Sequence, residues 1–110
     1  MATMKQIREL ADKIVREFRP DKIILFGSYA NGKLTPDSDV DLLVILPFEG
    51  KGFWKSLEII NRVNASFALD VMARRSDDTA RRYAEGDPLI REALDHGEVL
   101  YERRDQGVGT

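Results

Sequence analysis

The chain has 110 residues, of which 43% are apolar and 33% charged, and this balance is typical of one globular domain. Seventeen basic residues against nineteen acidic ones give a formal charge of −2, which argues against a protein dedicated to duplex DNA. The absence of cysteine excludes disulfides, zinc–thiolate sites and thiol catalysis.

Nothing in the sequence predicts a membrane segment or a leader. No apolar run approaches the roughly 20 residues that cross a bilayer, and the N-terminus lacks the apolar region of a signal peptide. We therefore expect a cytoplasmic protein with no membrane partner.

The first part of the chain predicts a helix and then a strand. Residues 3–18 carry apolar side chains at helical spacing, Thr3 and Gln6 match a capping box, and Pro20 ends the helix. Lys22 to Phe26 predicts a short strand, because Ile23 to Phe26 form a continuous apolar run, as expected of a strand covered on both faces.

The next segment predicts a tight turn and a second strand. Gly27 ends the first strand, and Ser28 opens a short helix through about Asn31. A polar turn then leads to Val40 to Leu46, which is the strongest strand signal of the chain, and Pro47 closes it.

The second half of the chain predicts three helices and two strands. A helix from Phe53 to about Val63 is expected to direct Trp54, Leu57, Ile60 and Val63 inward. A strand covers Phe67 to Ala73. The signals that follow are Ser76 as the cap of a helix through Ala84, Asp87 as the cap of a helix with Pro88 at its first position and Gly97 at its end, and an edge strand from Glu98 to Glu102.

This order of elements predicts an α+β fold (of α/β character). We expect a short mixed β-sheet backed by helices that pack mainly on one side. Residues 1–102 would form a single domain, and residues 103–110 a flexible C-terminal tail.

Asp39 and Asp41 are the first candidate site residues. Residues i and i+2 of a strand point to the same face, with Cα atoms about 6.5–7 Å apart. Two carboxylates held at this spacing repel each other and favour a counter-charge, and Mg²⁺ prefers such oxygen ligands. The alternative interpretation is a polar strand start followed by a turn aspartate.

Gly27 and Ser28 are the second candidate. A glycine allows the backbone to approach a ligand closely, and the free N–H groups of a helix start suit a phosphate. The Ser28 hydroxyl can donate to a phosphate oxygen or cap the helix. Taken alone the pair is an ordinary turn, so its interpretation depends on its short distance in sequence from the two aspartates.

Asp70 is the third candidate. A lone carboxylate inside an apolar strand is costly unless it has a partner. If its strand lies beside that of Asp39 and Asp41, three carboxylates converge and can hold cations or accept a proton. The alternative is a strand-edge aspartate that faces water.

These motifs together resemble the DNA polymerase β-like nucleotidyltransferase superfamily in its minimal form, the MNT domain, as in the MNT antitoxins of HEPN/MNT toxin–antitoxin systems. The resemblance lies in Phe26 to Gly32, in Asp37 to Val44, and in Asp70 within Leu69 to Val71. It covers about residues 4–101. One departure is Asn31, which stands where the family commonly has an arginine and which brings no charge.

The resemblance implies a role for each candidate. Gly27, Ser28 and Asn31 would bind the nucleoside triphosphate. Asp39, Asp41 and Asp70 would be the catalytic and Mg²⁺-binding residues, with Asp70 binding metal or accepting the proton of the attacking hydroxyl.

The resemblance also implies a reaction and a partner. A hydroxyl would attack the α-phosphorus of ATP, with Mg²⁺ bound, and AMP would pass to a tyrosine of a helical HEPN-type toxin, so that the chain acts as an antitoxin. Two alternatives stay open: a non-catalytic module that neutralises its partner by covering it, and transfer to a small molecule or RNA. A homodimer is open as well.

Overall fold

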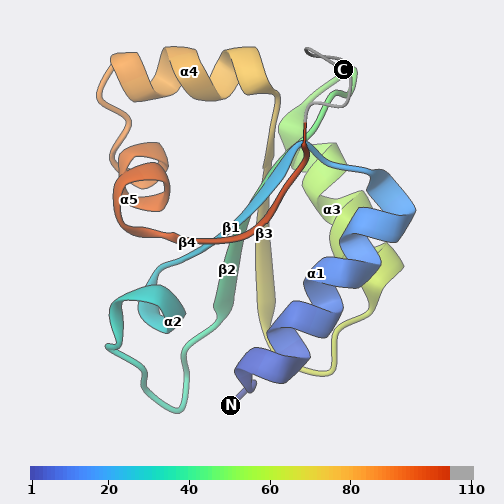
Figure 1. Cartoon of the computed structure of the whole chain (residues 1–110), viewed down its shortest axis with the longest axis vertical. Helices are drawn as coiled ribbons and strands as arrows, with labels where there is room; N and C mark the ends of the chain where they lie inside the picture. The colour runs from blue at the N-terminus through green and yellow to red at the C-terminus, as the bar shows by residue number, and fades with distance from the viewer. Residues whose placement is uncertain (105–110) are drawn as a thin grey trace.

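The structure, a computed structural model, describes residues 1–104 and contains one four-stranded sheet with five helices. Figure 1 shows the arrangement. The elements in chain order are α1 (Met4–Phe18), β1 (Lys22–Phe26), α2 (Ser28–Asn31), β2 (Val40–Ile45), α3 (Gly52–Val63), β3 (Leu69–Arg74), α4 (Ser76–Ala84), α5 (Pro88–His96) and β4 (Glu98–Glu102).

The sheet is mixed, with the strand order β3-β2-β1-β4. β1 pairs antiparallel with both β2 and β4, whereas β2 and β3 are parallel. The helix α3 supplies the crossover that a parallel pair requires. The predicted α+β class with a short mixed sheet is therefore confirmed, and β3 and β4 are its edge strands.

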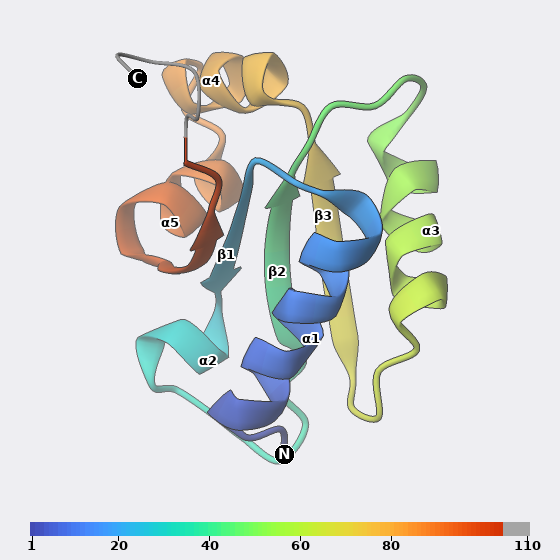
Figure 2. The same cartoon turned by 45° about the vertical axis from the view of Figure 1, so that its right-hand side comes forward.

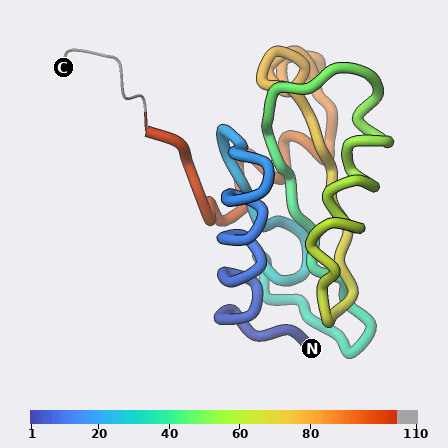
Figure 3. Tube along the Cα trace, turned by 90° about the vertical axis from the view of Figure 1, so that its right-hand side faces the viewer, coloured from blue at the N-terminus to red at the C-terminus, as the bar shows by residue number. Residues whose placement is uncertain are grey.

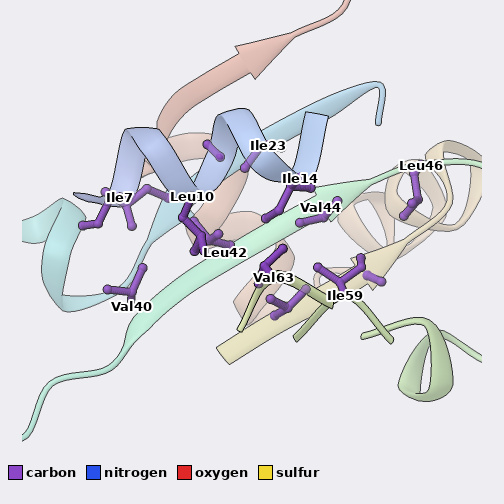
Figure 4. Packing of buried hydrophobic residues seen from close by; sticks show 14 residues of the cluster. Ile7, Leu10, Ile14, Ile23, Val40, Leu42, Val44, Leu46, Ile59 and Val63 are labelled. Carbon is purple, nitrogen blue, oxygen red and sulfur yellow. The ribbon is translucent and has the colours of Figure 1, made fainter. Parts of the chain in front are cut away.

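Helices cover both faces of the sheet (Figure 2). α1 and α3 lie side by side over one face (Figure 3), where Ile7, Leu42 and Ile59 are among the residues of the main core (Figure 4). α5 packs on the opposite face, where Ile90 lies in a second cluster with Leu43. The expectation that helices cover mainly one side of the sheet is thus wrong. The apolar residues of β2 point alternately to both faces of the sheet, so helices pack on both faces.

Two of the predicted helix starts are confirmed. The Thr3 hydroxyl oxygen accepts a hydrogen bond from the Gln6 N–H, and the Gln6 side-chain oxygen accepts one from the Thr3 N–H, which completes the capping box. Asp87 caps α5 by accepting from the N–H groups of Leu89 and Ile90. The prediction for Ser76 is wrong: Arg75 is the extended N-cap residue, and Ser76 is already the first residue of α4.

The predicted inward stripe of α3 is only partly correct: Val63 is buried and Ile60 packs against the main core, but Trp54 and Leu57 are not buried. Trp54 is 65% exposed and Leu57 36% exposed, and the buried residues of the helix are Ser56, Ile59 and Val63. Ser56 is buried because its hydroxyl accepts a hydrogen bond from the N–H of Ala73 at 2.9 Å. The face of α3 that packs on the sheet therefore carries this hydrogen bond together with the buried side chains of Ile59 and Val63.

The C-terminal strand continues into an anchored residue. The N–H of Arg103 donates to the carbonyl of Asp21 at 2.8 Å, and its guanidinium donates to the carbonyl of Arg19 at 3.0 Å. From residue 105 on, the expected flexible tail lies outside the described residues. Within residues 1–104, no helix has both the length and the apolar character that a bilayer span needs.

Candidate active site

The candidate residues from the three strands lie in one row across the sheet. In the register of β1 and β2, Phe26 is the partner of Asp41, and in that of β2 and β3, Asp41 is the partner of Asp70. Gly27 follows Phe26 directly, so it lies on one side of Asp41 and Asp70 on the other. The row lies at the end of the sheet where β1 ends and β2 and β3 begin, near α2 in Figure 1.

Gly27 lies in direct contact with the carboxylate of Asp41. Its φ of +72° and ψ of −150° belong to a region that only glycine adopts without strain. A Cβ atom added to Gly27 would overlap Oδ2 of Asp41. The missing side chain therefore allows the backbone at the start of α2 to lie against the acidic strand.

Ser28 and Asn31 are the first and last residues of α2. The Asn31 side-chain oxygen accepts from the N–H of Lys33 at 2.9 Å, so this oxygen is occupied within the turn. Beside Gly27 and Asn31 lies a pocket of about 150 Å³, whose wall is completed by Phe26, Ala30, Glu92 and His96.

Asp41 lies in an unfavourable electrostatic environment. Burial, together with the negative charges of Asp70, Asp39 and Glu92, raises the pKa of Asp41 to about 6. The side chains of Asp39 and Asp70 are exposed, while that of Asp41 is half-buried. The raised pKa indicates that a cation or a proton is needed here to balance the carboxylates.

The donor set fits a hard divalent cation in chemistry. Carboxylate oxygens at an accessible strand end are the ligands that Mg²⁺ prefers, together with phosphate oxygens. Across residues 1–104, no group of three or more acidic or histidine side chains already stands at ligand distances. Asp39, Asp41 and Asp70 therefore share one end of the sheet, and a cation held between them would require their side chains to move together.

Glu92 is a residue of this site that reasoning from the sequence missed. It comes from α5 and contributes to the raised pKa of Asp41, and it shares the small pocket with His96. Residues four apart on a helix lie on the same face, so Glu92 and His96 form one polar strip. The spacing of these two residues was the only signal in the sequence, because nothing local places α5 above β2.

Comparison of the sequence with known protein families assigns the chain to a family. The chain belongs to the nucleotidyltransferase domain family, whose sequence model matches residues 7–100. It is 36% identical over 74 residues to the bifunctional uridylyltransferase/uridylyl-removing enzyme of Bradyrhizobium diazoefficiens, a match that covers 66% of this chain and 8% of that enzyme.

A second relative is closer in size. The chain is 44% identical over 43 residues to a proposed protein adenylyltransferase of Methanocaldococcus jannaschii, a match that covers 37% of this chain and 43% of that protein. The matched regions thus span less than half the length of both relatives.

Solved structures share the fold. A proposed nucleotidyltransferase from Sulfolobus solfataricus superposes with a TM-score of 0.64 and 16% identity, over 90% of this chain and 79% of that chain. A chain from a toxin–antitoxin complex with AMP-PNP superposes with a TM-score of 0.57 and 22% identity, over 88% and 74% of the two chains. The chain therefore has the nucleotidyltransferase fold, as the resemblance predicted.

Proposed function

We propose that the chain is a Mg²⁺-dependent nucleotidyltransferase that transfers a nucleoside monophosphate, AMP from ATP, to a hydroxyl of a partner protein. The observation that carries the proposal is the row Gly27, Asp41 and Asp70. The backbone of Gly27 lies on one side of Asp41, whose pKa is raised, and the carboxylate of Asp70 lies on the other. An acid with a strongly raised pKa beside other carboxylates is typical of functional sites.

The row separates a donor side from an acceptor side. On the β1 side, Gly27 and Ser28 would offer backbone N–H groups to the triphosphate, and Ser28 and Asn31 would offer small polar side chains. The N–H of Asn31 is already bonded to the carbonyl of Gly27. Asp39 and Asp41 would hold Mg²⁺, which when bound offsets the charge of the phosphates. On the β3 side, Asp70 is left to complete the metal site or to face the acceptor.

The proposed step is a single displacement at phosphorus. The acceptor hydroxyl oxygen forms a bond to the α-phosphorus, the bond between this phosphorus and the bridging oxygen breaks, and pyrophosphate leaves. The hydroxyl proton passes to the carboxylate of Asp70. The protein contributes by positioning the groups and by balancing charge, as in phosphoryl transfer generally.

For the acceptor we propose a tyrosine of a helical HEPN-type partner, so that the chain acts as an antitoxin. This proposal rests on the resemblance to the MNT domain, on the proposed protein adenylyltransferase among the relatives, and on the toxin–antitoxin complex with AMP-PNP among the structures of the same fold. The match to uridylyltransferases favours UTP as the second candidate donor.

The test uses this chain with the protein encoded by the neighbouring gene, Mg²⁺ and each of the four α-labelled nucleoside triphosphates. We expect label from ATP on the partner, with its position read by tandem mass spectrometry. The double variant Asp39→Asn with Asp41→Asn should abolish labelling. Asp37→Asn, which removes one charge from the same turn, should leave labelling unchanged.

The same variants separate the alternatives. Equal labelling by the double variant contradicts the catalytic assignment. A double variant that still neutralises its partner, with no covalent mark on the partner in the wild type, identifies a module that acts by covering the partner. Label from UTP alone would change the donor and leave the site assignment intact.

A further inference from the structure

β3 is an edge strand, and only one end of its outer edge is closed. Ala68 and Arg74 direct their carbonyl groups to β2, where they accept from the N–H groups of Val40 and Leu46. Because backbone groups alternate along a strand, those of Leu69, Val71 and Ala73 point away from the sheet. The outer edge therefore carries three outward positions.

The position at Ala73 is closed by the chain itself. The N–H of Ala73 donates to the hydroxyl of Ser56, and the carbonyl of Ala73 accepts from the guanidinium of Arg74 at 2.8 Å. Gly52 allows this closure, because a Cβ atom there would lie 2.6 Å from the Ala73 carbonyl oxygen. These contacts protect this end of β3 from pairing with another chain.

No comparable contact closes the other end of the edge, which is the end beside the candidate site. Leu69 is half-buried there, and Val71 is 5% exposed. For the outward N–H and C=O groups of Leu69 and Val71, residues 1–104 offer no hydrogen-bond partner. Asp70 lies between these two residues, so the free backbone groups flank the proposed acceptor-side carboxylate.

A groove of about 330 Å³ runs along this edge and is apolar on its α3 side. Phe53 is 62% exposed there, and Leu57 36% exposed. The groove is lined by Phe53, Leu57 and Ile60 from α3 and by Asp70, Met72 and Arg74 from β3, among others. Exposed apolar side chains beside free strand groups are the features that bind an extended peptide.

We propose that this groove is the docking site of the acceptor: an extended, hydroxyl-bearing segment of the partner protein adds as a short strand to Leu69–Val71. The proposal rests on the proposed function for its choice of occupant. In an added strand, the residue opposite Asp70 points to the same face as Asp70, with a Cβ–Cβ separation of about 5 Å. A hydroxyl on that residue would lie beside the carboxylate.

The geometry also limits what can dock. The closed position at Ala73 restricts pairing to two outward positions, so the added strand is short and binding depends on the apolar contacts with α3. Leu57 and Phe53 then select an apolar residue near the acceptor hydroxyl. The docking site lies on the β3 side of Asp41 and the triphosphate on the β1 side, so the two can be occupied together.

The test measures amide hydrogen exchange by NMR on the ¹⁵N-labelled full chain, with and without the protein encoded by the neighbouring gene. We expect exchange at Leu69 and Val71 to slow at least tenfold in the complex, while that of Ala73, already bonded to Ser56, changes little. Phe53→Asp should weaken binding at least tenfold. Leu89→Asp is the matched control, because Leu89 is also exposed and also the second residue of its helix.

The other outcomes distinguish a failure of the docking site from a failure of the proposed function. If the partner is labelled while exchange at Leu69 and Val71 is unchanged, the docking site is wrong and the proposed function stands. If the partner does not bind, or if Phe53→Asp and Leu89→Asp bind equally, the docking site is wrong. If amide exchange at Leu69 and Val71 slows as the concentration of this chain rises without the partner, a second copy of the chain is the occupant and the proposal is wrong. Slowing with the partner but no labelling supports the docking site and contradicts the proposed function.

Discussion

The α-carbon of Gly27 lies against the carboxylate of Asp41, close enough that a methyl group on it would overlap Oδ2. The contact joins the turn after β1 to the first residues of β2, and it explains why these two segments must be adjacent for the site to form. It also offers a direct test of the site.

We expect Gly27→Ala to destabilise the fold by about 2–3 kcal/mol. The cost combines a backbone conformation that is restricted to glycine with the displacement of the Asp41 carboxylate. Urea unfolding measures the change. Gly32→Ala is the control, because Gly32 has a φ of +79° but has no atom near its missing side chain. That variant should lose only about 1 kcal/mol, and equal losses would contradict the role of the contact.

Asp41→Asn should stabilise the metal-free protein at neutral pH. The pKa of Asp41 is raised to about 6 from an unfolded value of 3.8, so the folded state binds a proton more tightly than the unfolded state. The free energy of unfolding contributed by this group therefore falls as the pH rises from about 4 to about 6 and stays low above that. After allowance for solvent screening of a half-exposed carboxylate, the gain above pH 7 is about 1 kcal/mol.

The measurement compares unfolding of the wild type and Asp41→Asn at pH 4 and pH 7.5 with EDTA present. The variant should gain stability only at the higher pH. Asp37→Asn serves as the control for the loss of one negative charge. A gain for Asp41→Asn that does not depend on pH would show that the carboxylate is not strained by its neighbours.

Local signals in the sequence predicted much of this fold. The capping box at Thr3, the cap at Asp87 and the apolar run of β2 each depend on neighbours a few residues away, and each was confirmed. Asp41 lies in β2, whereas Asp39 directly precedes its first residue, Val40.

The features that the sequence did not predict depend on contacts between distant segments. Trp54 was expected inward because an apolar stripe normally faces the core, but the face of α3 that packs on the sheet carries Ser56, which accepts a hydrogen bond from Ala73. Glu92 reaches the site only because α5 crosses the second face of the sheet. No short-range pattern contains either relationship.

Asp70→Asn should separate nucleotide binding from transfer. If Asp70 accepts the proton, the variant keeps the binding of the Mg²⁺ complex of ATP and loses transfer by about 10²–10⁴-fold. Calorimetry measures binding, and single-turnover labelling of the partner measures transfer. Asp37→Asn is again the control. A matching loss of ATP binding in Asp70→Asn would assign this residue to the metal site instead.

Ser56→Ala should destabilise the protein by about 1–3 kcal/mol, because it leaves the N–H of Ala73 without its acceptor in a buried position. The matched control is Thr79→Val, which also removes a buried hydroxyl. The Thr79 hydroxyl donates to the carbonyl of Arg75, which keeps its bond from the N–H of Thr79. Thr79→Val should therefore cost less in the same urea unfolding experiment.

Ser56→Ala should also open the closed end of β3, so amide exchange at Ala73 should accelerate while that of Leu69, already free, stays constant. An unchanged rate of amide exchange at Ala73 would show that α3, and not the Ser56 hydroxyl, protects this edge.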